Sequence, residues 1–136
     1  MSGYSGTPLP RKLGIAEGGT FAIVAGPDDA DVLLGELPAG ARRVADPAAA
    51  DVVLVFTVAR EELARHVEAL GRAIFPDRML WVAWPKRASK VPTDVTEDVV
   101  RDVALPLGLV DTKVAAIDAV WSGLRLVWRR ELRDAG

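Results

Sequence analysis

The sequence contains no cysteine and only one histidine, His66. The absence of cysteine excludes disulfides, thiolate metal sites and a cysteine nucleophile. With one histidine, a metal site built from several imidazoles is excluded as well, and only one base is left for a serine–histidine couple. His66 lies beside a stripe of apolar helical positions, and we interpret it as a surface or boundary residue. The residue types therefore predict neither a metal site nor a catalytic residue.

The chain also lacks a long hydrophobic segment and a strong net charge. The longest apolar run, VVLVFTVA, is too short to cross a bilayer, and the first residues have no apolar core of signal-peptide length. We therefore expect a soluble, cytoplasmic protein. The formal net charge of −2 produces no overall field that would attract nucleic acid or an anionic membrane, so neither is expected as a partner.

The size and composition are those of one globular domain. The chain has 136 residues, of which 50% are apolar and 26% are charged. Its first residues hold two prolines and two glycines, which predicts an irregular arm over residues 1–12 with a short helical turn around 10–13. Residues 13–136 are expected to form a single α/β domain.

Short apolar runs alternate with amphipathic segments along this domain. The run VVLVF is rich in β-branched residues that fit a pleated sheet, whereas Leu63, Val67, Leu70 and Ile74 recur at helical spacing. We expect strands at 21–25, 41–46, 50–58 and 79–84, helices at 27–38, 60–76 and 93–108, and two strands within 112–130. Strands that alternate with helices form a parallel sheet covered on both faces. The prediction is a three-layer, mostly parallel, Rossmann-like sheet that ends in an antiparallel hairpin.

Three details of this scheme concern single residues. In the helix at 27–38, the residues expected to face the sheet are Val32, Leu33 and Leu37. Asp94 and Glu97 have the spacing of a capping pair for the helix at 93–108. Gly123 is expected in the turn of the final hairpin.

The segment KLGIAEGGTFAIVAGPDD, at the first strand, resembles the entry of class I methyltransferases into their first strand and glycine loop. That family's cofactor loop has an acid within the strand and several glycines after it, which let the backbone approach the cofactor. Here Ile23 stands at the position of the acid, Ala25 and Pro27 stand at glycine positions, and Gly26 remains. The resemblance implies the methyltransferase fold in shortened form. The departures predict that S-adenosylmethionine is not bound in the usual manner, and no cofactor is predicted.

A second resemblance covers nearly the whole chain. The segment GYSGTPLPRKLGI and the motifs WPK…S…PTD.TED and GLVD.KV.AID..WSGLR look like those of a family of short bacterial proteins. The family is catalogued as domain of unknown function 3052. The resemblance implies a single-domain cytoplasmic protein and brings no activity with it.

Three cations follow the strand that ends at Trp84, and a helix start follows them. In open α/β sheets, ligands bind outside the carboxyl ends of the strands, and cations beside a helix N-terminus form an anion site. We interpret the stretch as a site for a phosphate or carboxylate, with Trp84 half-exposed. The alternative is a solvated loop whose cations pair with the acids of the next helix. The cations are Lys86, Arg87 and Lys90, and the acids are Asp94, Glu97 and Asp98.

The final hairpin carries the other polar cluster. Asp118, Trp121 and Arg125 are interpreted as a ligand wall or partner surface, with Arg125 stacked near Trp121. The alternative is a turn held by hydrogen bonds from aspartate and serine to the backbone. If the first hairpin strand is parallel to the others, the turn shares an edge of the sheet with Lys86. Lys86 or Lys90 and the helix start near Asp94 should border the main pocket, together with Trp121 or Arg125. The predicted ligand-binding residues are Trp84, Lys86, Lys90, Asp94, Asp118, Trp121 and Arg125.

The function expected from these features is a non-catalytic domain that binds a small anionic or nucleotide-like molecule, or has a regulatory role. One alternative is an enzyme with a divergent cofactor site. Asp46, twenty positions after Gly26, has the spacing of a ribose-binding acid, which is weak support without the glycine fingerprint. A second alternative is a protein–protein interaction module, or a homodimer, that uses the C-terminal hairpin.

Overall fold

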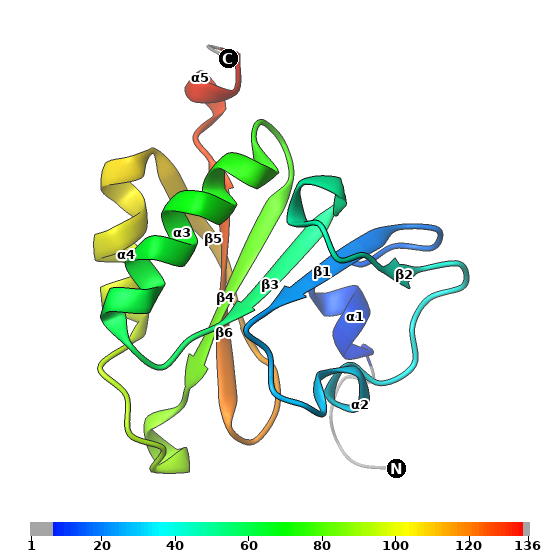
Figure 1. The fold of residues 1–136 in the computed structure, drawn as a ribbon, viewed down its shortest axis with the longest axis horizontal. Coiled ribbons are helices and arrows are strands. Elements are labelled where there is room, and N and C mark those ends of the chain that lie inside the picture. Colours follow the sequence, from blue (N-terminus) through cyan, green and yellow to red (C-terminus); the bar gives the residue numbers. More distant parts are fainter. Residues whose placement is uncertain (1–6, 135–136) are drawn as a thin grey trace.

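The computed structural model describes residues 7–134, in which six strands form one sheet (Figure 1). The sheet order is β2-β1-β3-β4-β6-β5. The strands are β1 (Thr20–Val24), β2 (Arg42–Arg43), β3 (Val52–Phe56), β4 (Met79–Pro85), β5 (Leu109–Ala116) and β6 (Trp121–Trp128). The helices are α1 (Leu9–Lys12), α2 (Ala30–Leu34), α3 (Arg60–Ile74), α4 (Glu97–Ala104) and α5 (Arg130–Arg133).

Strands β1 to β4 pair in parallel, and β6 is antiparallel to both β4 and β5. The predicted three-layer, mostly parallel sheet with a closing antiparallel hairpin is therefore confirmed. The central strand β3 is buried at all five positions, as its unbroken apolar run requires. No helix within residues 7–134 has the length and apolar character to cross a membrane.

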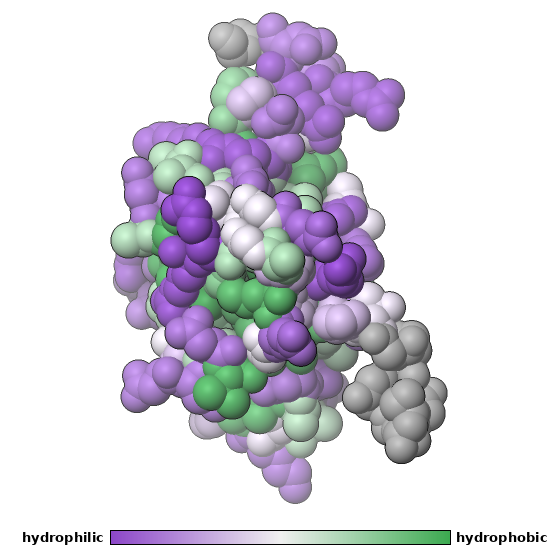
Figure 2. Space-filling view, turned by 90° about the vertical axis from the view of Figure 1, so that its right-hand side faces the viewer, coloured by the Kyte–Doolittle hydropathy of each residue, from purple (hydrophilic) through white to green (hydrophobic). Residues whose placement is uncertain are grey.

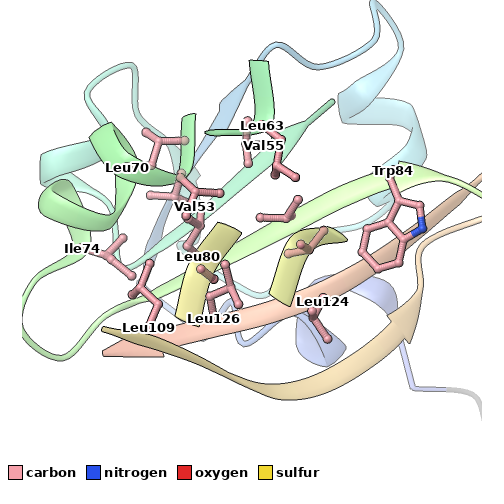
Figure 3. Close-up of a cluster of buried hydrophobic side chains, with 14 of the residues drawn as sticks. Val53, Val55, Leu63, Leu70, Ile74, Leu80, Trp84, Leu109, Leu124 and Leu126 are labelled. Carbon is pink, nitrogen blue, oxygen red and sulfur yellow. The ribbon is translucent and has the colours of Figure 1, made fainter. Parts of the chain in front are cut away.

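One face of the sheet is covered by α3 and α4 (Figure 3). The predicted helical stripe of α3 is buried there, with Leu63, Val67 and Ile74 fully inaccessible to solvent. These side chains pack on alternate residues of β3 and β4, since strand side chains alternate between faces. Helix α4 ends at Ala104 and continues as a 3-10 turn over Leu105–Leu107, because Pro106 cannot donate a helical hydrogen bond.

The other face is covered by shorter elements, namely α1, α2 and the segment that follows α1. Four residues of the expected arm thus form a helix, while residues 1–6 lie outside the described part. The buried Trp81 of β4 donates its indole N–H to the carbonyl oxygen of Leu13 at 2.8 Å. This bond fixes the segment after α1 on the sheet. Figure 2 views the molecule from the right-hand side of Figure 1, toward the sheet edge formed by β2, where apolar residues are visible among hydrophilic ones.

Two of the residue-level expectations are wrong in this region. Val32 is 80% exposed, because α2 is only five residues long and buries Ala30 and Leu34, which lie four positions apart on its inner face. Gly123 lies within β6 and not in the turn. A Cβ at this position would lie 3.1 Å from Cδ1 of Ile117 and 3.2 Å from Cε3 of Trp81, so the packing of these side chains explains the glycine.

The Trp81 bond generates a prediction for stability. Trp81→Phe keeps most of the apolar volume but leaves the Leu13 carbonyl without its donor. The variant should lose about 1–3 kcal/mol of unfolding free energy, the penalty for a buried group without a partner. Urea denaturation measures this loss. The matched control is Trp84→Phe, three residues along the same strand, since among the described residues the indole N–H groups that donate are those of Trp81 and Trp128. Equal losses in the two variants would contradict the assignment.

Candidate functional site

The segment after β4 borders a hollow of about 460 Å³ at the carboxyl edge of the sheet. We call it the loop hollow. It is lined by Trp84, Pro85, Arg87, Lys90, Val91, Pro92, Thr93, Val95 and Thr96. Two of these described residues carry a positive charge and none carries a negative one. The hollow therefore combines cations with an apolar wall.

The acid closest to this loop in the sequence does not cap the following helix. Asp94 Oδ1 accepts the backbone N–H of Arg60 at 2.7 Å, so it satisfies a free donor at the start of α3. The neighbouring Thr93 hydroxyl donates to the carbonyl oxygen of Val58 at 2.6 Å. Helix α4 begins at Glu97, and Thr96 Oγ1 accepts from the Val99 N–H at 3.2 Å. The predicted Asp94–Glu97 capping pair is wrong, because Thr96 is the cap and Asp94 serves a different helix.

The acids of α4 are held by an arginine of the same helix. Arg101 pairs with Glu97, with Asp98 at 3.2 Å and with Asp111 of β5 at 2.9 Å. The hydrogen bond from Arg101 holds the pKa of the Asp111 carboxyl below its usual range. The hydrogen bonds to Asp111 and Glu97 raise the pKa of Arg101. This cluster joins α4 to β5.

Within residues 7–134, none of the three loop cations has a carboxylate within ion-pair distance. The alternative in which Lys86, Arg87 and Lys90 pair with Asp94, Glu97 and Asp98 is therefore not what the structure contains. The acids have other partners, and the positive charge of the loop is left uncompensated.

The loop conformation is fixed by local hydrogen bonds. A 3-10 turn covers Arg87–Ser89, and the Ser89 hydroxyl donates to the Lys86 carbonyl oxygen at 2.6 Å and accepts from the Val91 N–H at 3.2 Å. Lys90 has φ of 62°, a left-handed conformation that residues other than glycine adopt uncommonly. Backbone strain of this kind persists where the surrounding structure enforces it, and it is often found at functional sites.

The hairpin turn lies at the same edge of the sheet as the loop, as predicted. Pro85 is opposite Trp121, and the Lys86 N–H donates to the Val120 carbonyl oxygen at 2.7 Å. The side chains of the hairpin nevertheless have structural partners. Asp118 Oδ1 accepts the N–H groups of Val120 and Trp121, both at 2.8 Å, and so holds the turn.

Trp121 and Arg125 of the hairpin also pack away from the loop hollow. Trp121 contacts Phe56 edge to face, with ring centroids 4.8 Å apart. Arg125 lies over Trp81 at 6.0 Å and not over Trp121, because the strand register places it opposite Trp81. The predicted stacking of Arg125 near Trp121 is therefore wrong.

Of the seven predicted site residues, two line the loop hollow, namely Trp84 and Lys90. The expectation that this site is the main pocket is wrong, since a hollow of about 800 Å³ lies beside α1 and the segment after α2. Trp84 is only 6% exposed and forms part of the wall. Arg87, one of the three loop cations, also lines the hollow, whereas Thr93 and Thr96 were not predicted although both stand in the motif that pointed to the site.

The loop after β1 lies apart from both hollows, since no residue of 24–29 lines either one. Gly26 serves the packing of the fold, because a Cβ there would lie 2.6 Å from Cγ2 of Ile23. Asp46 Oδ1 accepts the Ala48 N–H at 2.9 Å and caps a 3-10 turn. Among the described residues, no group of three or more histidine, cysteine, aspartate or glutamate side chains could hold a metal ion.

Solved structures with low sequence identity share this arrangement. A protein assigned to the type 11 methyltransferases of Sulfolobus solfataricus is 11% identical, with a TM-score of 0.59 over 89% of both chains. A SAM-dependent methyltransferase from Aquifex aeolicus is 14% identical, with a TM-score of 0.53 over 85% of both chains. A protein of the NADB-Rossmann superfamily from Streptococcus agalactiae is 8% identical, with a TM-score of 0.54 over 92% of this chain and 69% of the other.

The fold is methyltransferase-like. At these identities the likeness concerns the fold alone. No protein-family model matches the chain, and no curated protein does either. The resemblance to the bacterial family of unknown function stays a prediction.

The Asp94 bond predicts which helix depends on this residue. Asp94→Ala should lower the unfolding free energy by about 0.5–2 kcal/mol, the range for a lost helix cap. Amide hydrogen exchange should become faster at the start of α3. Thr96→Ala is the control, since it removes the cap of α4 and should speed exchange there. Faster exchange confined to α4 in Asp94→Ala would contradict this role.

The Arg101–Asp111 pair predicts a pH dependence. The lowered pKa of Asp111, whose usual value is 3.8, means that this carboxylate stabilises the fold above that pH. Its contribution is lost as the pH falls through the lower pKa of the folded state. Urea denaturation between about pH 2 and 6 should show stability falling below about pH 4. Asp111→Asn should flatten this dependence, whereas Asp77→Asn, an exposed acid without an ion pair among the described residues, should not.

Proposed function

We propose that this protein is a non-catalytic domain that binds a small anionic or nucleotide-like molecule in the loop hollow and acts as a binding or regulatory protein. The observation that carries the proposal is the pair of uncompensated cations, Arg87 and Lys90, on the wall of a hollow of about 460 Å³. Its position at the carboxyl edge of a mostly parallel sheet is where open α/β folds bind ligands.

The charge of the hollow favours an anion. Neither of its cations has a carboxylate within ion-pair distance in the described part of the chain, and attraction is stronger in a partly enclosed space than in bulk water. Arginine also presents a planar fork of donors that fits carboxylate or phosphate oxygens.

The remaining wall favours a ligand with an apolar body. Trp84 and Val95 are buried behind the surface, and Val91 is 40% exposed at the opening. The hydroxyl of Thr93 already donates to the Val58 carbonyl oxygen, so the cations are the main polar contacts available. A phosphorylated or carboxylated metabolite has both required parts.

A second candidate function is an enzyme with a divergent cofactor site. It is favoured by two of the structural neighbours, which are named as methyltransferases. The cofactor would have to bind apart from residues 24–29. There Ile23 packs closely on Gly26 and fills the space in which a glycine loop would approach a cofactor. Methyl transfer to any substrate class would support this candidate over the first.

Anion binding by the loop hollow can be tested with inorganic phosphate and citrate. Either anion should raise the melting temperature of the protein, since a ligand that binds the folded state stabilises it. In Arg87→Gln/Lys90→Gln the dissociation constant should rise at least about fivefold, because charged hydrogen bonds contribute about 1.5–3 kcal/mol. The control is Lys86→Gln, a neighbouring cation that does not line the hollow. Equal weakening by the control would overturn the assignment to this site.

The divergent loop after β1 predicts the response to S-adenosylmethionine. A ligand at a hundredfold excess over its dissociation constant stabilises a fold by about 2.7 kcal/mol. We expect no such gain with millimolar S-adenosylmethionine. Calorimetry that shows micromolar affinity, together with shifts at the amides of residues 24–28, would contradict this expectation and favour the enzyme.

A further inference from the structure

A second group of cations gathers on the opposite face of the sheet from α3 and α4. It comprises Arg11, Lys12, Lys113 and Arg125, which we call the basic cluster. Lys113 and Arg125 are directly opposite each other on β5 and β6. Like charges at opposed positions of neighbouring strands destabilise a sheet. The cluster therefore holds two cations together where the fold alone would favour a charge of opposite sign.

The buried Trp81 organises this cluster. Arg125 lies over its ring at 6.0 Å, and its indole N–H binds the carbonyl oxygen of Leu13. The preceding carbonyl, that of Lys12, accepts from Lys113 Nζ at 3.5 Å. Residues about a hundred positions apart are brought together in this way, and Lys113 of the hairpin comes to lie beside the end of α1.

The cations of the cluster have no acidic partner. Among the described residues, no carboxylate lies within ion-pair distance of any of the four. The Arg125 Nε is held by the Thr112 hydroxyl at 2.8 Å, which fixes the guanidinium and leaves its two terminal nitrogens without a protein partner in the described part of the chain. A fixed guanidinium of this kind loses less entropy when it binds oxygen atoms in pairs.

Space for a ligand lies beside the cluster. Arg11 and Lys12 line the hollow of about 800 Å³, together with apolar residues that include Leu37 and Ile117. Glu36 is the one carboxylate among its described lining residues. The hollow would let a ligand extend from the cations toward an apolar surface.

We propose that the basic cluster is a second anion site, separate from the loop hollow, and that it takes a small molecule with two or more linked phosphate groups. The cations come from two segments, α1 and the hairpin, which meet at the contact of Lys113 with the Lys12 carbonyl oxygen, so a ligand with linked phosphates could bind cations of both. A single phosphate would leave the opposed Lys113 and Arg125 only partly compensated. Inorganic pyrophosphate is the simplest probe of this chemistry.

The test uses Arg87→Gln/Lys90→Gln as the parent protein, so that the loop hollow does not contribute. Pyrophosphate is titrated while the indole N–H signal of Trp81 is followed by NMR, because Arg125 lies over this ring and Leu13, which binds the N–H, follows Lys12. We expect saturable shifts of this signal and an affinity for pyrophosphate at least tenfold higher than for orthophosphate. Absence of binding by the parent protein, or equal affinity for the two anions, would overturn the proposal.

The decisive variant is Lys113→Glu. It places opposite charges across β5 and β6 next to Arg125, so the free variant should melt at the same or a higher temperature. Its dissociation constant for pyrophosphate should nevertheless rise at least tenfold. Retained affinity in this variant would overturn the proposal, and so would single-stranded RNA that competes for the cluster and binds more tightly than pyrophosphate.

Discussion

The hydrogen bond between the Trp81 indole and the Leu13 carbonyl is the constraint on which one whole layer of this fold depends. The face opposite α3 has no long helix to cover it, and the short elements there contribute little stability of their own. A buried bond between residues 68 positions apart holds the segment after α1 against the sheet. The same indole, together with Ile117, leaves no room for a side chain at Gly123, and Arg125 lies over its ring. The N-terminal segment is in this sense part of the core.

The charges at the carboxyl edge follow from how the acids are used. Asp94 is committed to the start of α3, and Glu97, Asp98 and Asp111 are committed to Arg101. Each carboxylate near the loop thus has a structural task, and the loop cations remain without a counter-charge in the described residues. A chain whose net charge is only −2 can therefore present local regions of positive potential, which the total charge conceals.

Much of the architecture could be predicted from the sequence, because unbroken apolar strands and the α3 stripe are strong local signals. The shared edge of loop and hairpin followed from strand direction alone. The errors concern partners that are distant in sequence. Asp94 has the local spacing of a cap, but whether it serves α4 or α3 depends on a contact 34 positions away. The stacking partner of Arg125 was decided by strand register, and the site residues Thr93 and Thr96 gave no signal beyond their place in the motif.

The hydrogen bonds that join the segment before α4 to the turn before α3 limit how the carboxyl edge can move. Thr93 and Asp94 hold the turn before α3 by bonds to Val58 and Arg60, while the residues just before them form the wall of the loop hollow. The loop cannot be displaced without breaking these bonds or carrying the start of α3 with it. Helix α3 is continuous over fifteen residues, and near its far end Gly71 accepts the indole N–H of Trp128 on the last strand. Helix α3 therefore connects a candidate binding site at one end with the last strand at the other.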